Sequence, residues 1–268
     1  MSGGKRARAK GGGRRLPWLT LLLLAAVVVL AVLWWRERAA NEAPRPAATP
    51  AATADVPPAT PNVAGLLPDE RLAAAVKAAF PAGNTAESES GEHYVFDEHR
   101  LVDTPFGPVL VSEGQVAEPA HVSTGRLNIT YLKPDGERYA VDRRFPEAVL
   151  AGSMGRMSDW SVSNKFGRLP VVQAQGGGTW QGYTCGRTTL VELQPTGPVK
   201  LADFLDSYDD GGAAVGRPQS SQGKIINIVP DQSFTVRFTG ARAFEARYVR
   251  VGDAYRVEGG EANMLQGC

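Results

Sequence analysis

One long apolar stretch dominates the N-terminal part of the chain. Residues 16–35 contain a single polar side chain, a threonine. A helix of about twenty residues spans roughly 30 Å, the thickness of a bilayer core. Trp18 stands near one end of this stretch and Trp34 with Trp35 at the other, where indole rings favour the membrane interface. The pattern therefore predicts a single transmembrane helix over residues 16–36.

Further along, the pattern becomes that of a folded domain. Pro68–Phe80 places Leu72, Val76 and Phe80 four residues apart and carries acidic residues in its first turn, which predicts a helix. Residues 84–92 are polar. We predict that they form a loop between this helix and the strands that follow.

From residue 93 onward, short alternating runs predict β-structure. Residues 127–131 alternate apolar and polar side chains, and a Pro-Asp-Gly turn leads from them into residues 138–141, which is the clearest hairpin signal of the chain. Leu201–Ser207 is the only segment of this region predicted as a helix. Further strands are predicted at residues 109–112, 171–174, 188–193, 224–229, 234–239, 244–251 and 254–258.

Short strands about 8–12 residues apart favour a mainly β fold: an antiparallel sandwich, an open barrel or two small packed sheets. One short N-terminal helix and the transmembrane helix precede the strands. The predicted parts are a basic cytoplasmic tail (1–15), the anchor helix (16–36), an Ala/Pro-rich disordered linker (37–64) and a β-rich extracytoplasmic domain (65–268), with a subdivision near 217–222 left open.

Charge predicts the orientation of the chain. Residues 1–38 carry eight basic residues and one acidic residue, whereas the remainder carries 21 basic and 27 acidic residues. The positive-inside rule then places the N-terminus in the cytoplasm and the domain in the periplasm or outside the cell. The alternative is a cleaved signal peptide, whose apolar region is usually about 7–15 residues long and ends at small residues. Here the stretch is longer and ends in Trp-Trp-Arg, so we expect an uncleaved anchor in the inner (plasma) membrane.

The linker is rich in proline. Residues 41–62 hold six prolines spaced by Ala and Thr, with few apolar side chains that could form a core. An extended chain of this composition reaches roughly 70 Å at about 3.1 Å per residue. We therefore interpret the linker as a tether that holds the domain away from the membrane.

The chain has two cysteines, Cys185 and Cys268. Outside the cytoplasm they could pair and tie the C-terminus to the strand region. Two free thiols remain the alternative, because two cysteines in a sequence do not fix the geometry of a bond.

The most distinctive local string is Gly176–Gly182, Gly-Gly-Gly-Thr-Trp-Gln-Gly. It lacks the lysine of a phosphate loop and does not match GxGxxG. Its simplest interpretation is a flexible turn beside core aromatic side chains. With neighbouring aromatics it could also shape a pocket for a sugar or a peptide, so the candidate binding residues are Trp160, Thr179, Trp180, Gln181 and Tyr183.

Three other groups lead to no assignment. His93, His99 and His121 could form a metal site, but no HExxH or other tight ligand spacing supports one. Ala151–Gly155 is an Ala variant of the GxSxG elbow, and no histidine follows it to complete a triad. The four aspartates between residues 203 and 210 lack the register of an EF-hand loop. We assign no catalytic residue, metal ligand or cofactor.

These features predict a single-pass membrane-anchored envelope protein whose extracytoplasmic β-domain binds a protein or cell-wall partner. The net acidic charge of the predicted domain argues against nucleic-acid binding, which needs a basic surface. The layout resembles that of many bacterial envelope proteins, a likeness that assigns no residue roles. The alternative is a membrane-anchored hydrolase, which could be metal-dependent through the three histidines.

Overall fold

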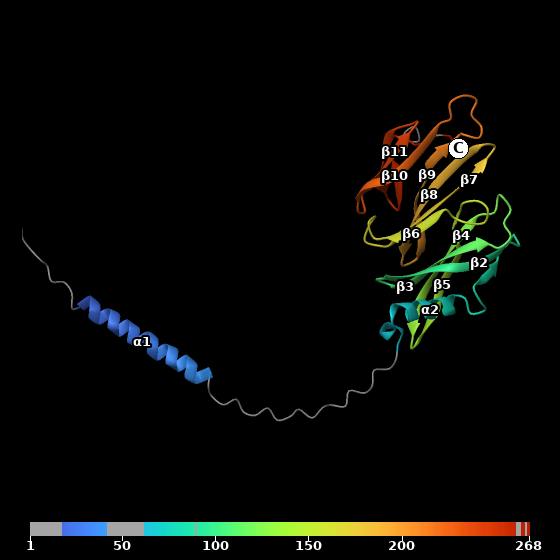
Figure 1. Cartoon of the computed structure of the whole chain (residues 1–268). Helices are drawn as coiled ribbons and strands as arrows, with labels where there is room; N and C mark the ends of the chain where they lie inside the picture. Colours follow the sequence, from blue (N-terminus) through green and yellow to red (C-terminus); the bar gives the residue numbers. More distant parts are fainter. Residues whose placement is uncertain (1–17, 42–61, 89, 261–263, 266) are drawn as a thin grey trace, which may run out of the picture. The chain divides into compact units, whose positions relative to one another are not determined.

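The computed structural model separates into two compact units, Met1–Ala59 and Thr60–Cys268 (Figure 1). In the first unit, helix α1 spans Trp18–Asn41. The structure describes residues 18–41, 62–88, 90–260, 264–265 and 267–268, without the side chains of 18–25 and 38–41.

The predicted anchor falls only partly within these residues. The described side chains of α1, from residue 26 to residue 37, are all exposed. Among the described residues, no helix is long and apolar enough to cross a membrane. The predicted tail (1–15), the first two residues of the predicted span (16–17) and residues 42–61 of the predicted linker lie outside the described residues.

The second unit begins with a short 3₁₀ helix, η1 (Val63–Gly65). The side chain of Val63 is buried, and its N–H donates to the carbonyl of Gly136 at 2.9 Å. Residues 62–64 were predicted to be linker. Because Val63 is buried in a core cluster, these residues belong to the folded unit.

Helix α2 (Pro68–Ala79) confirms the helix predicted at Pro68–Phe80. Its start is set by proline in the first turn and by Glu70, whose carboxylate accepts the N–H of Leu67 at 3.0 Å. Pro81 follows the C-cap residue Phe80 and cannot continue the helix.

A five-stranded antiparallel sheet follows in sequential order. Its strands are β1 (Thr85–Glu87), β2 (His93–Thr104), β3 (Gly107–Val116), β4 (Gly125–Asp135) and β5 (Arg138–Ala151). The predicted hairpin is confirmed as β4–β5, with Gly136 in the turn at φ 61°. The prediction of a loop throughout residues 84–92 was wrong, because β1 pairs with the backbone of β2 although its own side chains are exposed.

An eight-stranded antiparallel sheet continues the meander. Its strands are β6 (Asp159–Ser163), β7 (Val171–Trp180), β8 (Tyr183–Gln194), β9 (Gly197–Asp209), β10 (Ser220–Val229), β11 (Ser233–Gly240), β12 (Phe244–Val251) and β13 (Ala254–Val257). Strands β9 and β10 pair with each other, so the sheet runs across residues 217–222, where the sequence allowed a subdivision.

The helix predicted at Leu201–Ser207 was wrong, because this segment is part of β9. Leu201 and Leu205 stand four residues apart, which resembles one face of a helix. However, the segment pairs with β8 along its length, and Leu201 and Phe204 are buried in the core beneath the sheet. Tertiary packing therefore overrides the local helical pattern.

The folded unit is mainly β and is built in layers. Helix α2 packs on one face of the five-stranded sheet, around Leu110, Leu132 and Tyr139. The other face packs against β6, β7 and β8. The eight-stranded sheet curls into a half-barrel, in which β13 contacts β9. A second core, rich in phenylalanine and tyrosine, fills the inside of the half-barrel. Of the three forms predicted, two packed sheets is the one observed.

Candidate functional site

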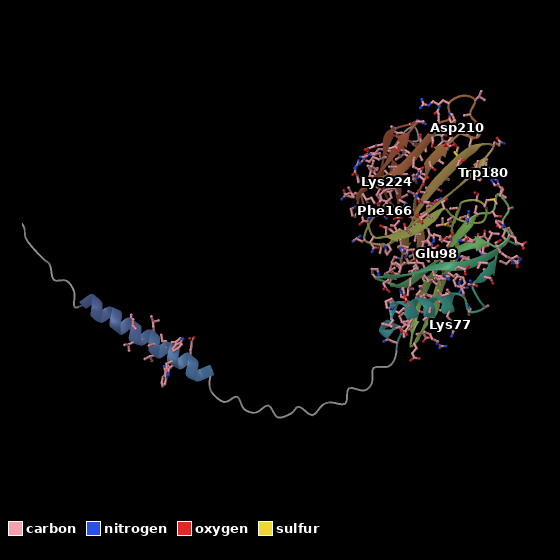
Figure 2. All side chains as sticks on the ribbon, in the orientation of Figure 1. Lys77, Glu98, Phe166, Trp180, Asp210 and Lys224 are labelled. Atoms are coloured by element: carbon pink, nitrogen blue, oxygen red, sulfur yellow. A yellow bond between two sulfur atoms is a disulfide. The ribbon has the colours of Figure 1, made fainter. Side chains whose placement is uncertain are left out.

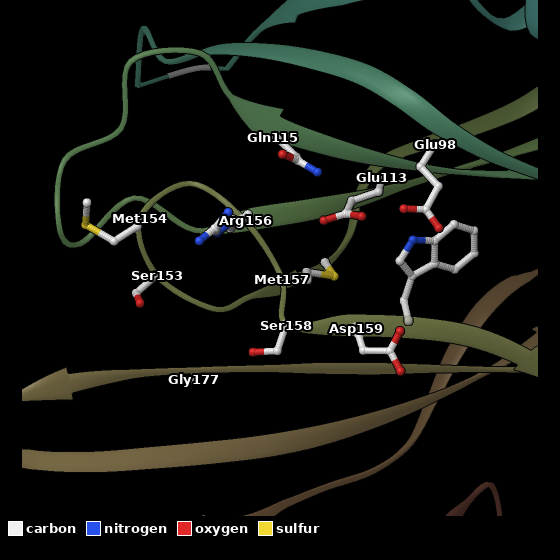
Figure 3. A pocket seen from close by; sticks show the side chains of 11 residues that line it. Glu98, Glu113, Gln115, Ser153, Met154, Arg156, Met157, Ser158, Asp159 and Gly177 are labelled. Carbon is white, nitrogen blue, oxygen red and sulfur yellow. The ribbon is translucent and has the colours of Figure 1, made fainter.

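A polar cleft of about 520 Å³ lies beside the core between the two sheets (Figure 3). Strands β2 and β3 form one wall, and the segment that leads into β6 forms the other. We call it the carboxyl cleft. Its charged lining residues are Glu98, Glu113, Asp159 and Arg156, accompanied by the polar side chains of Gln115, Ser153 and Ser158.

Strand register brings two of the carboxyls together. Glu98 on β2 stands directly opposite Glu113 on β3, and side chains so paired lie on the same face of the sheet. Along β3, Val109 and Val111 on this face belong to the core between the sheets. Two and four residues beyond Val111 the same face carries Glu113 and Gln115. The cleft therefore begins where one strand face changes from apolar to polar.

Burial makes Glu113 an unusual carboxyl. It is only 6% exposed, whereas Glu98 opposite is exposed. Burial raises the pKa of Glu113, a hydrogen bond from the Met157 backbone N–H opposes the rise, and the neighbouring Glu98 carboxyl adds to it. In Figure 3 the two carboxyl groups point into the same space. The cleft therefore contains two adjacent carboxyl groups, of which one is buried and the other is exposed.

A buried donor faces this pair. Trp160 on β6 lines the cleft and is 8% exposed. Its indole N–H acts on the Glu113 carboxyl and lowers the pKa of that group, yet it reaches no partner with hydrogen-bond geometry among the described residues. Buried polar groups are hydrogen-bonded in most proteins, so an N–H without a well-aligned partner is a donor that a ligand in the cleft could use.

The opposite wall is a tight loop that contains the Ala151–Gly155 string. Gly152 and Gly155 adopt positive φ values of 86° and 73°. A Cβ at Gly152 would come within 2.0 Å of the Arg156 carbonyl oxygen, so only glycine allows this close return of the chain. Ser153 pairs with Arg156 in a short bridge, and both residues line the cleft. The string therefore shapes the wall of the cleft.

The chemistry of the cleft follows from these groups. Carboxylates accept hydrogen bonds, whereas the indole N–H and a guanidinium donate them. A hydroxyl group both donates and accepts, so a ligand rich in hydroxyls could satisfy both kinds of group at once. Two adjacent carboxyls, one of them buried, also have the composition of an acid–base pair.

The structure does not bring all the predicted binding residues together. Thr179, Trp180, Gln181 and Tyr183 lie at the tip of the β7–β8 hairpin, whereas Trp160 lies in the carboxyl cleft. Trp180 and Tyr183 are both partly exposed at the tip. Thr179 and Thr184 share a hydrogen bond of 2.8 Å across the hairpin, and Gln181 takes a positive φ of 51° in its turn.

The glycine run serves close packing. A Cβ at Gly176 would lie 2.3 Å from the backbone nitrogen of Gly152, and one at Gly178 would lie 2.3 Å from the indole ring of Trp180. Gly176–Gly178 belong to strand β7, and the Trp180 ring packs directly over Gly178. Trp180 and the two cysteines also line a cavity of about 370 Å³. The centroids of the Trp180 and His121 rings are 6.0 Å apart.

The two cysteines form a disulfide. Cys185 on β8 bonds to Cys268 across 83 positions of sequence, with Cα atoms 6.3 Å apart. The sequence left free thiols as an alternative, and the structure contains the bond. It attaches Cys268 to the beginning of β8, close to the tip of the β7–β8 hairpin.

The three histidines have different neighbours and do not form a cluster among the described residues. His99 shares a hydrogen bond of 2.9 Å with Ser112, burial lowers its pKa, and His121 lies against Trp180. His93 begins β2 and pairs in register with Glu87. Within the described parts of the chain, no group of three His, Cys, Asp or Glu side chains could hold a metal ion.

The acidic stretch of β9 is also divided. Asp203 pairs with Arg187 at 2.6 Å, whereas Asp206 is buried in the half-barrel. Asp209 and Asp210 accept backbone N–H groups of Gly211 and Gln219, at 2.8 and 2.6 Å. The last two aspartates therefore fold the loop between β9 and β10.

Sequence reasoning missed the cleft that Glu98, Glu113 and Asp159 line, and the pairing of Glu98 with Glu113. One signal was present: Glu113 lies at strand spacing from Val109 and Val111, where a carboxylate is rarely buried. The partner of Glu113 depends on the register of β2 against β3, which the sequence does not state.

Comparison with known proteins gives no match. No protein family, curated protein or solved structure matches this chain. The assignment of a function therefore depends on the residues and geometry described above.

Proposed function

We propose that this chain is a single-pass, membrane-anchored envelope protein whose folded unit binds a hydroxyl-rich cell-wall ligand in the carboxyl cleft. One observation carries the proposal: the buried Trp160 N–H lies beside the Glu113 carboxyl, and among the described residues it has no partner with full hydrogen-bond geometry. Sugar hydroxyls supply both an acceptor and donors. The cleft volume of about 520 Å³ falls within the range of small-molecule sites.

The proposed location rests on the sequence, with support from the disulfide. The apolar stretch 16–36 and the basic tail 1–15 are those of an anchor whose N-terminus is cytoplasmic. A disulfide such as Cys185–Cys268 persists in oxidising compartments and is rare in the cytoplasm. The linker 37–64 then acts as the tether, and the domain works in the periplasm or outside the cell.

Ligand binding is tested with oligosaccharides of N-acetylglucosamine as soluble probes of cell-wall glycan. Titration of the purified full-length chain should show saturable binding. Trp160→Phe keeps the apolar ring but removes the N–H, and we expect affinity to fall about tenfold, the effect of losing one buried hydrogen bond. Trp180→Phe, at the hairpin tip, is the matched control and should bind as the wild type does. Equal affinity of the two variants would contradict the proposal.

The anchor is tested separately in cells. The full chain should remain with membranes after alkaline extraction, and thiol labelling should find Cys185 and Cys268 oxidised until a reductant is added. A soluble chain that begins after residue 39 would show that the N-terminal segment is cleaved, which contradicts the anchor and leaves the cleft untouched.

One observation favours hydrolysis as a second function. Glu98 and Glu113 are adjacent, and burial of one raises its pKa, as a general acid requires. If the pair is catalytic, Glu98→Gln and Glu113→Gln should each abolish turnover of the same oligosaccharides. Binding without product formation in the wild type contradicts the hydrolase and leaves the binding proposal in place.

A further inference from the structure

The half-barrel opens between two of its strands. Strand β9 begins at Gly197 and β10 ends at Val229, but they pair only where Ser207–Asp209 meets Ser220–Gln222. Beyond this short ladder the two strands separate. A cavity of about 500 Å³ occupies the opening, and we call it the half-barrel cavity.

One wall of this cavity carries a buried carboxyl. Asp206 on β9 is 7% exposed and accepts hydrogen bonds from the Thr188 hydroxyl and, at 3.5 Å, from the Gln175 amide. Gly186 leaves room for this carboxyl, because a Cβ there would lie 2.6 Å from its Oδ1. Burial raises the pKa of Asp206.

The partners of Asp206 are neutral. Arg187 attracts it at a distance, but the guanidinium of Arg187 is bonded to Asp203 at 2.6 Å. Within the described part of the chain, no salt bridge reaches Asp206. The Ser207 hydroxyl and a backbone N–H also bond to Asp206, so every donor that reaches it among the described residues is neutral. Buried carboxylates are usually paired with a cation, and this one is not.

The remaining walls are apolar. Phe166 and Phe204 are buried around the cavity, whereas Ile225 and Ile228 of β10 are only partly covered. The exposed Lys165 and Lys224 also line it, and Figure 2 shows Lys224 and Phe166 on the same part of the half-barrel. A ligand in this cavity would therefore lie close to two lysines at its exposed edge and to one carboxyl and two phenylalanine rings inside.

We infer that the half-barrel cavity is a second ligand site, which takes a small organic monoamine with an apolar body. The ammonium group would donate to Asp206, whose present partners are neutral dipoles, and charge-assisted bonds of this kind are the strong ones. The apolar body would cover the exposed parts of Ile225 and Ile228. Lys165 and Lys224 would repel a second positive charge, so a monoamine should bind in preference to a diamine of the same length.

The test uses three probes of similar shape and different charge: phenethylamine, 2-phenylethanol and 3-phenylpropanoate. In calorimetric titrations of the purified full-length chain, phenethylamine should bind at least about tenfold more tightly than the alcohol, because a bond to a charged group is the stronger. Asp206→Asn should remove this tenfold preference. Glu245→Gln is the control, because it makes the same carboxyl-to-amide change in an exposed pair on β12 that does not line the cavity, and it should retain the preference.

Two further variants decide the remaining outcomes. Trp160→Phe in the carboxyl cleft should leave phenethylamine binding unchanged, which separates this site from the proposed glycan site. Tighter binding of 3-phenylpropanoate, lost in Lys224→Gln, would overturn the inference and assign the cavity to an anion. Equal binding of amine and alcohol, or no binding of any probe up to about 10 mM, would overturn it as well. Unfolding curves of Asp206→Asn check that the variant is folded.

Discussion

The carboxyl cleft and the half-barrel cavity each contain one buried carboxyl, but the two differ in their surroundings. Glu113 lies beside a second carboxyl and the indole N–H of Trp160 in a polar cleft. Asp206 accepts hydrogen bonds from two hydroxyls and an amide, beside phenylalanine rings. Burial raises the pKa of both groups. The direction of a pKa shift therefore identifies neither ligand; the neighbouring groups distinguish a hydroxyl-rich ligand from an amine.

A third buried carboxyl sharpens this comparison. Glu192 on β8 has a side chain only 5% exposed and receives two hydrogen bonds from Arg250, at 3.1 and 3.2 Å. Its charge is compensated within the protein, so it has no need of a ligand. Glu113 and Asp206 differ from Glu192 in having no salt bridge among the described residues, and they are the two carboxyls at which we propose ligand binding.

The largest expected effect comes from breaking that pair. Arg250→Ala would leave the Glu192 charge buried without its main partner, and we expect a loss of about 3–5 kcal/mol in the free energy of unfolding. The measurement is chemical denaturation at neutral pH. Arg237→Ala is the matched control, because Arg237 pairs with Glu245 on the neighbouring strand with both side chains about half exposed. That change should cost less than about 1 kcal/mol.

A loss of similar size in both variants would contradict the comparison. It would mean that the Glu192–Arg250 pair contributes no more than a surface pair does. If Arg250→Ala also costs less than about 1 kcal/mol, then water and the Gln194 amide, which donates to Glu192 at 2.8 Å, are enough to stabilise the Glu192 charge.

Replacement of Glu113 should stabilise the protein at neutral pH, whereas replacement of Arg250 should destabilise it. Because its pKa is raised in the folded state, its contribution to stability is complete below the unfolded carboxyl pKa of about 4.3 and is lost as pH rises through the folded value. Glu113→Gln removes this loss, so we expect the variant to be roughly 1 kcal/mol more stable than the wild type at pH 7. The difference should shrink toward pH 4. Denaturation curves between these pH values measure it, and a variant less stable than the wild type at pH 7 would contradict the assignment.

Much of the fold could be predicted from local pattern. Helix α2, the β4–β5 hairpin and the C-terminal strands follow from periodicity and turn residues, which act over a few positions. The segment Leu201–Ser207 was wrong because its spacing fits a helix equally well until β8 pairs with it. Local patterns are decisive only where tertiary pairing agrees with them.

The sites were harder to predict for a related reason. The sequence string around Trp180 was conspicuous, yet its glycines serve close packing of β7. Glu98 and Glu113 are separated by a hairpin, and only the register of β2 against β3 places them opposite each other. Asp206 was noticed within an acidic stretch, although what distinguishes it is burial. The arrangement of both candidate sites therefore depends on long-range pairing, which one sequence does not specify.

The smallest expected effect is also the sharpest test of independence between the two sites. Glu113 and Asp206 line different cavities on different sheets, with no lining residue in common. The changes in stability of Glu113→Gln and Asp206→Asn should therefore add in the double variant to within about 0.5 kcal/mol. Denaturation of the wild type, both single variants and the double variant completes this cycle. A larger coupling would show that the two carboxyls respond to one shared rearrangement of the sheets, and ligand binding at one site would then alter binding at the other.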